Sequence, residues 1–176
     1  MGASIHRRVR SVHSQFPLDP QFLAWRAREA NFATRFIDLA EQVNTAMPVY
    51  TAARIADILN GRGLPVFGTR LLGVGIAYKP NVRDDRESAS LAVLEELRRR
   101  GAVVDVLDPI VGDATIARRG FAAANPDALD GYALAIVLTD HDVIDLAALA
   151  AAVPVVFDTR GAYRRRGVEA GNVLTL

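Results

Sequence analysis

Cysteine is missing from the 176 residues of this chain. Its absence excludes disulfides, thiolate nucleophiles and cysteine-ligated metal ions within these residues. Histidine is scarce as well. His6, His13 and His141 stand at no spacing to carboxylates that is typical of a metal site, so we expect no bound metal. Apolar runs as long as the ~18 residues of a membrane span are also lacking, and we expect a soluble, cytoplasmic protein.

Lysine is nearly absent, because 20 of the 21 basic residues are arginine. The formal net charge is +1, so no strong overall field attracts nucleic acid. Short basic clusters at residues 98–100, 118–119 and 164–166 lack the interleaved aromatic residues typical of nucleic-acid binders. We expect each cluster to end a helix or to lie in a solvated loop, and we expect no nucleic-acid partner.

The single lysine, Lys79, directly follows the apolar run Leu71–Ala77, which predicts a buried strand. A site that keeps one compact ammonium in an arginine-rich chain suggests recognition of a point-like anion, and phosphate is the natural candidate. The alternative is that one lysine survived by chance on a solvated loop.

The first part of the chain has a helical period. Asp19 followed by Pro20 is typical of a helix start, and a short helix ending near Glu29 is expected. Apolar residues then recur at three- and four-residue steps over residues 34–59, which predicts a long amphipathic helix that Pro48 kinks or divides. Its apolar surface must pack on the following domain, on another subunit, or on both.

From residue 68 onward, short apolar runs alternate with helical segments, which predicts an α/β domain. Its strands are nearly continuous in Val, Ile and Leu, as in a Rossmann-like parallel sheet with helices on both faces. The predicted strands are Leu71–Ala77, Val103–Leu107, Ala133–Leu138, Val153–Phe157 and an edge strand over 172–176; the predicted helices are Ser88–Arg100 and Leu146–Ala152.

Ligands of such sheets bind outside the carboxyl ends of the strands. The loops expected to converge there carry Lys79, Asp108-Pro109, Thr139-Asp140-His141 and Asp158-Thr159-Arg160.

The glycines of this region do not complete a dinucleotide fingerprint. Gly73 and Gly75 match the first two positions of Gly-x-Gly-x-x-Gly, but Tyr78 takes the third, so we do not predict an NAD site here. Ser88 is instead expected to cap the following helix, with Lys79 and Arg86 near its amino end, a combination that can hold a diphosphate.

Three stretches of the second part resemble the C-terminal domain of the UDP-glucose/GDP-mannose dehydrogenase family: Gly75–Asn81, Asp84–Ser88 and Gly101–Pro109. Upstream, residues 17–29 and 34–48 are similar to the segment that joins the two domains of the family. Their amino-acid sequence most resembles the UDP-N-acetylglucosamine and UDP-N-acetylmannosamine 6-dehydrogenases. The resemblance runs from residue 14 to the C-terminus.

We expect three segments. Residues 1–13, rich in arginine and without acidic residues, are expected to form a leader without regular structure. The resemblance implies a helical linker and dimerisation segment over 14–62 and a UDP-sugar-binding α/β domain over 63–176. Family members use NAD, bound to an N-terminal domain, to oxidise the C6 alcohol of a UDP-sugar to a carboxylate, and they dimerise through the central helix. We therefore expect UDP or a UDP-sugar as ligand and a homodimer through residues 34–59.

The catalytic half of the family pattern is incomplete in these residues. Gln15 stands where the family has its cysteine, whose thiolate traps the aldehyde intermediate, and an amide cannot do this. Asp19 stands at the family's water-orienting carboxylate, although a helix cap is the simpler interpretation. With no NAD domain in the sequence, we expect no tight NAD binding and no activity from the chain alone. The alternative is a structural subunit that complements a separate NAD-domain chain.

The binding half of the pattern carries over residue by residue. Lys79 matches the lysine that reaches the nucleotide-sugar, and Tyr78 matches an aromatic residue beside it. Arg160 matches an arginine that contacts the nucleotide-sugar, and Phe16 matches an apolar neighbour of the uracil. Arg86 matches an arginine on the cofactor side of the cleft.

Overall fold

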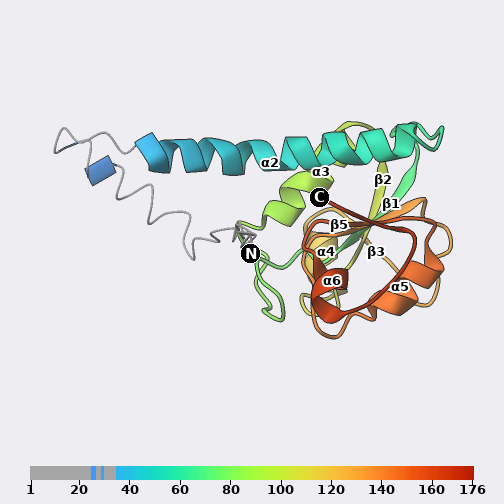
Figure 1. Ribbon diagram of the computed structural model, residues 1–176. Coiled ribbons are helices and arrows are strands. Elements are labelled where there is room, and N and C mark those ends of the chain that lie inside the picture. The colour runs from blue at the N-terminus through green and yellow to red at the C-terminus, as the bar shows by residue number, and fades with distance from the viewer. Residues whose placement is uncertain (1–24, 27–28, 30–34) are drawn as a thin grey trace, which may run out of the picture. The chain divides into compact units, whose positions relative to one another are not determined.

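The computed structural model describes Trp25, Arg26, Glu29 and residues 35–176 (Figure 1). By its contacts the chain divides into two units, residues 1–45 and 46–176. In the first unit, Trp25, Arg26 and Glu29 are helical, and Arg26 Nη1 donates to Glu29 Oε2 at 2.9 Å. The short helix predicted before Glu29 lies mostly outside the described residues.

The second unit is built on one parallel sheet, in the order β3-β2-β1-β4-β5-β6. The strands are β1 Arg70–Val74, β2 Val103–Leu107, β3 Ala122–Ala123, β4 Leu134–Val137, β5 Val156–Asp158 and β6 Val173–Thr175. The chain builds outward from β1 to β3, returns to place β4 beside β1, and then builds outward in the other direction. This order is that of a doubly wound fold, so the predicted Rossmann-like sheet is confirmed.

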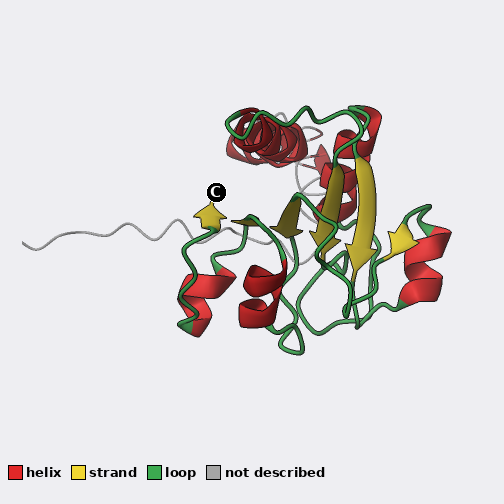
Figure 2. Ribbon diagram, turned by 90° about the vertical axis from the view of Figure 1, so that its right-hand side faces the viewer, coloured by secondary structure: helices red, strands yellow, loops and turns green. Residues whose placement is uncertain are grey.

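Helices cover both faces of the sheet (Figure 2). They are α3 Ala89–Arg99, α4 Asp113–Arg118, α5 Leu146–Ala152 and α6 Ala162–Arg166, together with the part of α2 (Arg35–Asn60) that follows residue 45. One core lies between the sheet and α2, α3 and α4, and a second lies between the sheet and α5 and α6. Neighbouring strand residues alternate between them: Leu71 belongs to the first core and Leu72 to the second. This alternation explains why the central strands are apolar at nearly every position.

The long helix α2 confirms the helical period expected over residues 34–59. It runs through Pro48 without a break, so the predicted division at this residue does not occur. Pro48 cannot donate to the carbonyl of Asn44, but Asn44 is exposed and water can take the place of the missing donor. Further along, Ala52, Ile55 and Leu59 are fully buried in the first core. Packing on the α/β domain therefore accounts for the apolar face of residues 46–60.

Some element boundaries agree with the sequence prediction and others differ. Residues 103–107 and 146–152 form the strand and the helix at the bounds expected. The sheet pairing of β5 begins only at Val156 rather than at Val153. The short elements α4, β3 and α6 were not expected, because two to six residues are too few to show a period.

The basic clusters lie at helix ends, as expected. Arg98 and Arg99 occupy the last turn of α3, Arg118 the last turn of α4, and residues 164–166 the last turn of α6. Positive charge is favourable there because the helix dipole is negative at its carboxyl end.

Strand β1 ends at Val74, three residues before the predicted boundary at Ala77, and Gly75 follows it. The φ of Gly75 is +80°, a left-handed conformation that residues other than glycine rarely adopt. A Cβ at this position would lie 2.0 Å from the carbonyl oxygen of Thr139, which follows β4. The absence of a side chain therefore lets the main chains after β1 and β4 approach each other.

We expect Gly75→Ala to lower the free energy of unfolding by about 2–4 kcal/mol, because the methyl group meets main-chain atoms and the backbone angle favours glycine. Gly171→Ala is the matched control, since a Cβ there meets nothing within 4 Å and its φ lies outside the left-handed region. Urea denaturation measures both variants. Equal unfolding free energies would contradict the close approach at Gly75.

Candidate functional site

The candidate site lies where the winding of the sheet reverses, between the carboxyl ends of β1 and β4. In doubly wound sheets, the loops that leave such a point in opposite directions open a crevice for ligands. Here they are residues 75–88 after β1 and 138–145 after β4. The loops after β2 and β5 flank them and begin at Asp108 and Thr159.

Asp108, the first residue after β2, joins three of these loops. Its carboxylate is buried and accepts hydrogen bonds from backbone N–H groups after β1 and after β2, and it lies 3.1 Å from Nε2 of His141 after β4. The backbone donors are Ile76 and Ala77 to Oδ2, at 2.7 and 3.0 Å, and Ile110 and Val111 to Oδ1, both at 3.0 Å. One side chain thus fixes how the strand ends are spaced.

His141 is fully buried, and its partners determine its tautomer. Nδ1 accepts the backbone N–H of Asn81 at 2.8 Å, so this nitrogen carries no proton. Nε2 therefore carries the proton and donates it to Asp108 Oδ2. The ring is a neutral bridge between a carboxylate and the loop after β1.

The hydrogen bonds to Asp108 also set its protonation. Burial raises the pKa of this carboxyl, but hydrogen bonds from His141, Val111 and Ile76 outweigh it and hold the pKa at about 2, against an ordinary value of 3.8. Asp108 is therefore ionised throughout the neutral range, and a buried negative charge lies behind the loops of the site.

The loop after β1 presents Tyr78 and Lys79 and is tied down on both sides of them. The N–H of Tyr78 donates to the carbonyl of Asp84 at 2.6 Å. Asn81 has a left-handed φ of +63° and exchanges hydrogen bonds with Asp142: its Nδ2 donates to Oδ2 at 2.7 Å, and its Oδ1 accepts the backbone N–H at 2.9 Å. Lys79 is half-buried, with Nζ 5.3 Å from the centre of the Tyr78 ring, a cation–π distance.

Ser88 occupies the N-cap position of α3, but its side chain makes no capping hydrogen bond, so the prediction of a serine cap is wrong. Its buried hydroxyl lies instead 3.5 Å from the carbonyl oxygen of Ala77. Thr139 Oγ1 donates to the same carbonyl at 2.8 Å. The hydroxyl is thus directed at the main chain after β1 and away from the helix.

Arg86, expected beside Lys79, pairs within its own loop. Its Nε and Nη2 donate to the two carboxylate oxygens of Asp84 at 2.9 and 2.8 Å, and its side chain is 82% exposed. Next to it, Asp85 accepts from Nε of Arg119 at 2.6 Å, which ties the loop to the end of α4. The structure does not bring Lys79 and Arg86 into one described contact, and the role of Arg86 stays a prediction.

Arg160 follows β5 and lies beside the buried carboxylate of Asp140, with Nε 3.9 Å from Oδ1. Arg165 forms an ion pair with the same carboxylate. Arg166 donates to the carbonyls of Asp140 and His141 at 3.0 and 2.8 Å. Three guanidinium groups therefore surround the loop after β4 on the side of α6.

The predicted binding residues thus stand on two loops that are anchored to the same third loop. Lys79 and Tyr78 are anchored to it through Asn81, and Arg160 lies beside it at Asp140. Gln15, Phe16 and Asp19 lie outside the described residues, and their roles stay predictions.

The bracing residues of the site were not recognised from the sequence. His141, Asp108 and Asp140 were placed on the converging loops, but no pattern indicated that His141 pairs with Asp108 or that Asp140 pairs with Arg165. The contact between Asn81 and Asp142 gave no signal, because it joins residues 61 positions apart. A polar residue directly after a buried strand is the one local sign that Asp108 and Asp140 carry.

The UDP-binding domain of the UDP-glucose/GDP-mannose dehydrogenase family matches residues 72–165, which run from β1 into α6. The chain belongs to this family. The match covers all four loops at the carboxyl edge of the sheet, so the family's UDP-binding domain and the candidate site occupy the same part of the chain.

Individual members of the family are similar to the chain in sequence and in structure. The chain is 31% identical to a UDP-N-acetyl-D-mannosamine dehydrogenase of Methanococcus maripaludis over 71% of its own length and 27% of the relative's. It is 30% identical to a UDP-glucose 6-dehydrogenase of Haloferax volcanii, over 73% and 30% of the two lengths. A solved UDP-glucose dehydrogenase of Pyrobaculum islandicum aligns with a TM-score of 0.67 and 26% identity, covering 82% of this chain and 33% of that one. The chain spans about a third or less of these relatives.

Two wider features of the described residues bear on function. Among Trp25, Arg26, Glu29 and residues 35–176, no three His, Asp or Glu side chains gather as metal ligands would. Within the same residues, each helix is too short or too polar to cross a membrane.

We expect acid to weaken the fold through Asp108. Because its pKa is depressed to about 2 in the folded state, its stabilisation is complete above pH ~4 and is lost as the pH falls toward 2, amounting to about 2 kcal/mol. Asp108→Asn should lower the unfolding free energy at neutral pH and make its decline between pH ~4 and ~2 shallower, as followed by urea denaturation across that range. Asp130→Asn, an exposed residue before β4, is the control. A parallel acid decline in Asp108→Asn and the parent would contradict the assignment.

Proposed function

We propose that this chain binds a UDP-sugar at the loops after β1, β4 and β5, as the nucleotide-binding part of an NAD-dependent nucleotide-sugar 6-dehydrogenase. The observation that carries the proposal is the family match over residues 72–165, which coincides with the point where the sheet reverses its winding. The relatives named above act on different UDP-sugars, a UDP-N-acetyl-D-mannosamine and a UDP-glucose. UDP is the part that these two substrates share, and the proposal is therefore made for UDP.

In this proposal the ammonium of Lys79 meets the diphosphate, with the ring of Tyr78 at its side. Arg160 contacts the nucleotide-sugar from the loop after β5, and Phe16 lies against the uracil. Arg86 faces the cofactor side. A single ammonium and a guanidinium approaching from two loops suit an anion that lies across the crevice between them.

We further propose that these 176 residues bind without oxidising. Oxidation of an alcohol to a carboxylate passes through an aldehyde, which the family holds on a cysteine thiolate, and the sequence contains no cysteine. Gln15 stands at that position, and for Asp19, at the family's water-orienting position, we propose the role of a helix cap. In the full-length family NAD takes up the hydride, and we expect no tight NAD binding by this chain.

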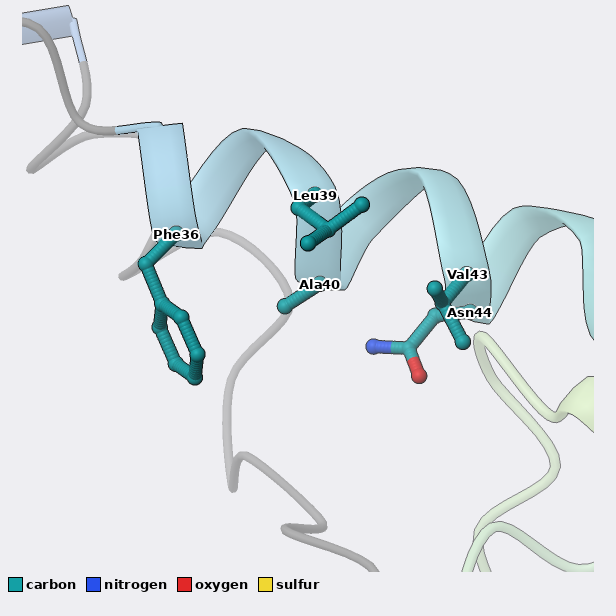
Figure 3. A pocket seen from close by; sticks show the side chains of 5 residues that line it. All are labelled: Phe36, Leu39, Ala40, Val43 and Asn44. Atoms are coloured by element: carbon teal, nitrogen blue, oxygen red, sulfur yellow. The ribbon is translucent and has the colours of Figure 1, made fainter.

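A second candidate function is that of a structural subunit, and the surface of α2 supports it. Phe36, Leu39, Ala40, Val43 and Asn44 line a hollow on one side of the helix, all within residues 35–45 (Figure 3). Phe36, Leu39 and Val43 are 83%, 56% and 52% exposed. Apolar side chains gathered at helical spacing are typical of a surface that pairs with another chain. We propose that α2 pairs two copies, and the alternative partner is a separate chain that carries an NAD domain.

Activity separates the two candidates. The recombinant chain supplied with UDP-N-acetylglucosamine and NAD should form no NADH. Chain isolated from its native cells together with a bound partner should form NADH if it complements an NAD-domain chain, and should form none if it acts by binding alone.

We expect Lys79→Ala to weaken UDP binding by about 1.5–3 kcal/mol, as for the loss of a charge-assisted hydrogen bond, with little change in melting temperature. Lys79→Arg should recover only part of the loss, because a planar guanidinium differs in shape from an ammonium. Titration calorimetry with UDP measures both, and Arg62→Ala, an exposed residue in the turn after α2, is the control. Equal affinity of Lys79→Ala and the parent for UDP would favour the alternative that Lys79 survived by chance on a solvated loop.

We expect the chain to sediment as a homodimer and Val43→Glu to dissociate it, because an unpaired carboxylate is costly to bury in an interface. Gln42→Glu adds the same charge at the neighbouring position, which does not line the hollow, and should leave the dimer intact. Analytical ultracentrifugation at micromolar concentration measures all three proteins. A parent that sediments as a 19.0 kDa monomer would rule out the pairing.

A further inference from the structure

Asn81, two residues after the lysine of the proposed site, ties the loop after β1 to the loop after β4. Three hydrogen bonds make this connection: the N–H of Asn81 to His141 Nδ1 at 2.8 Å, Asn81 Nδ2 to Asp142 Oδ2 at 2.7 Å, and the N–H of Asp142 to Asn81 Oδ1 at 2.9 Å. One residue thus uses its main chain and both polar atoms of its side chain toward the same neighbouring loop.

The far side of this connection is rigid. His141 is fully buried, and Asp108 holds its other nitrogen. Arg166 donates to the carbonyl of His141 at 2.8 Å. Asn81 itself adopts a left-handed φ of +63°, a conformation that asparagine tolerates better than most residues. That backbone angle turns its N–H and its side chain toward the same loop.

The chain between Asn81 and Lys79 transmits this order. Pro80 separates them, and its ring fixes its own φ. A residue that precedes proline is largely restricted to extended conformations, so Pro80 also limits the backbone angles that Lys79 can adopt. On the other side, the N–H of Tyr78 is held by the carbonyl of Asp84. Lys79 therefore lies in the short segment 78–81, whose two ends are held by hydrogen bonds.

We propose that Asn81, with His141 and Asp142 as its anchors, is a positioning residue that holds Lys79 for the UDP diphosphate. The inference rests on the proposed function, because it assumes that Lys79 meets the nucleotide. A lysine side chain loses much conformational freedom when it binds an anion, and a fixed backbone leaves less to be lost. Asn81 acts on affinity through Lys79 and does not touch the ligand.

The test measures UDP binding by titration calorimetry in variants that loosen the connection without adding charge. Asn81→Gly keeps the left-handed backbone and its N–H but removes both side-chain hydrogen bonds. We expect it to bind UDP about three- to tenfold more weakly, as for one or two lost hydrogen bonds. Circular dichroism at the temperature of the titration checks that the variant is folded.

Asp142 provides a matched pair of variants. Asp142→Asn and Asp142→Ala remove the same charge, but only the asparagine leaves an oxygen that can accept from Asn81 Nδ2. We expect Asp142→Asn to bind UDP within about twofold of the parent, and Asp142→Ala to bind about threefold more weakly than Asp142→Asn. The effect of removing the charge is common to both. Neither variant can accept from Arg166, which lies 3.4 Å from Asp142 Oδ1, while an asparagine oxygen faces Asn81.

A double variant asks whether Asn81 acts through Lys79. If it does, Lys79→Ala combined with Asn81→Gly should bind UDP within about twofold of Lys79→Ala alone, because the ammonium that the loop would position is already gone. Fully additive losses, unchanged affinity in Asn81→Gly, or equal affinities in Asp142→Ala and Asp142→Asn each overturn the inference. A parent that binds no UDP overturns the proposed function first, and the inference with it.

Discussion

The carboxylate of Asp108 is the interaction on which the carboxyl edge of the sheet depends. It accepts from the main chain after β1 and after β2 and from His141 after β4, so the three loops share one buried negative charge. A buried carboxylate is stable only when such donors surround it. The donors must therefore stay in place together, and this requirement links the geometry of the crevice to the stability of the domain.

Arginine and lysine have different tasks in this molecule. Arg98 bonds to the carbonyl of Gly120, Arg119 to the carboxylate of Asp85, and Arg166 to carbonyls of the loop after β4. These planar forks brace one element against another, which suits a side chain with several fixed donors. Lys79 lies over the Tyr78 ring at the edge where ligands of such sheets bind. The basic residues of the chain, 20 arginines and one lysine, thus agree with a structural use of arginine and a separate place for the one ammonium.

The sequence was informative where burial repeats with a period and silent where single side chains meet across the fold. The strand over 103–107 and the helix over 146–152 were predicted at their observed bounds because the burial of each leaves a clear pattern of apolar residues in the sequence. The early end of β1 follows from Gly75, whose close neighbour Thr139 is 64 positions away and cannot be read from local residues. The same is true of the bonds among Asp108, Asn81 and His141. Ser88 shows the converse error: a residue type typical of a cap occupies the cap position, yet its hydroxyl faces Ala77.

The order of the strands has a consequence for how the domain is made. Its central strand, β1, precedes the other described strands in the chain. Its partners β2 and β4 follow about 30 and 60 residues later. Parallel neighbours cannot pair through a tight turn, so β1 waits for both partners as the chain leaves the ribosome. Asp108 likewise lacks its histidine until residue 141 has emerged. The crevice can therefore form only after residue 141 has been made, and folding is expected to be governed by contacts between distant parts of the chain rather than by its helices.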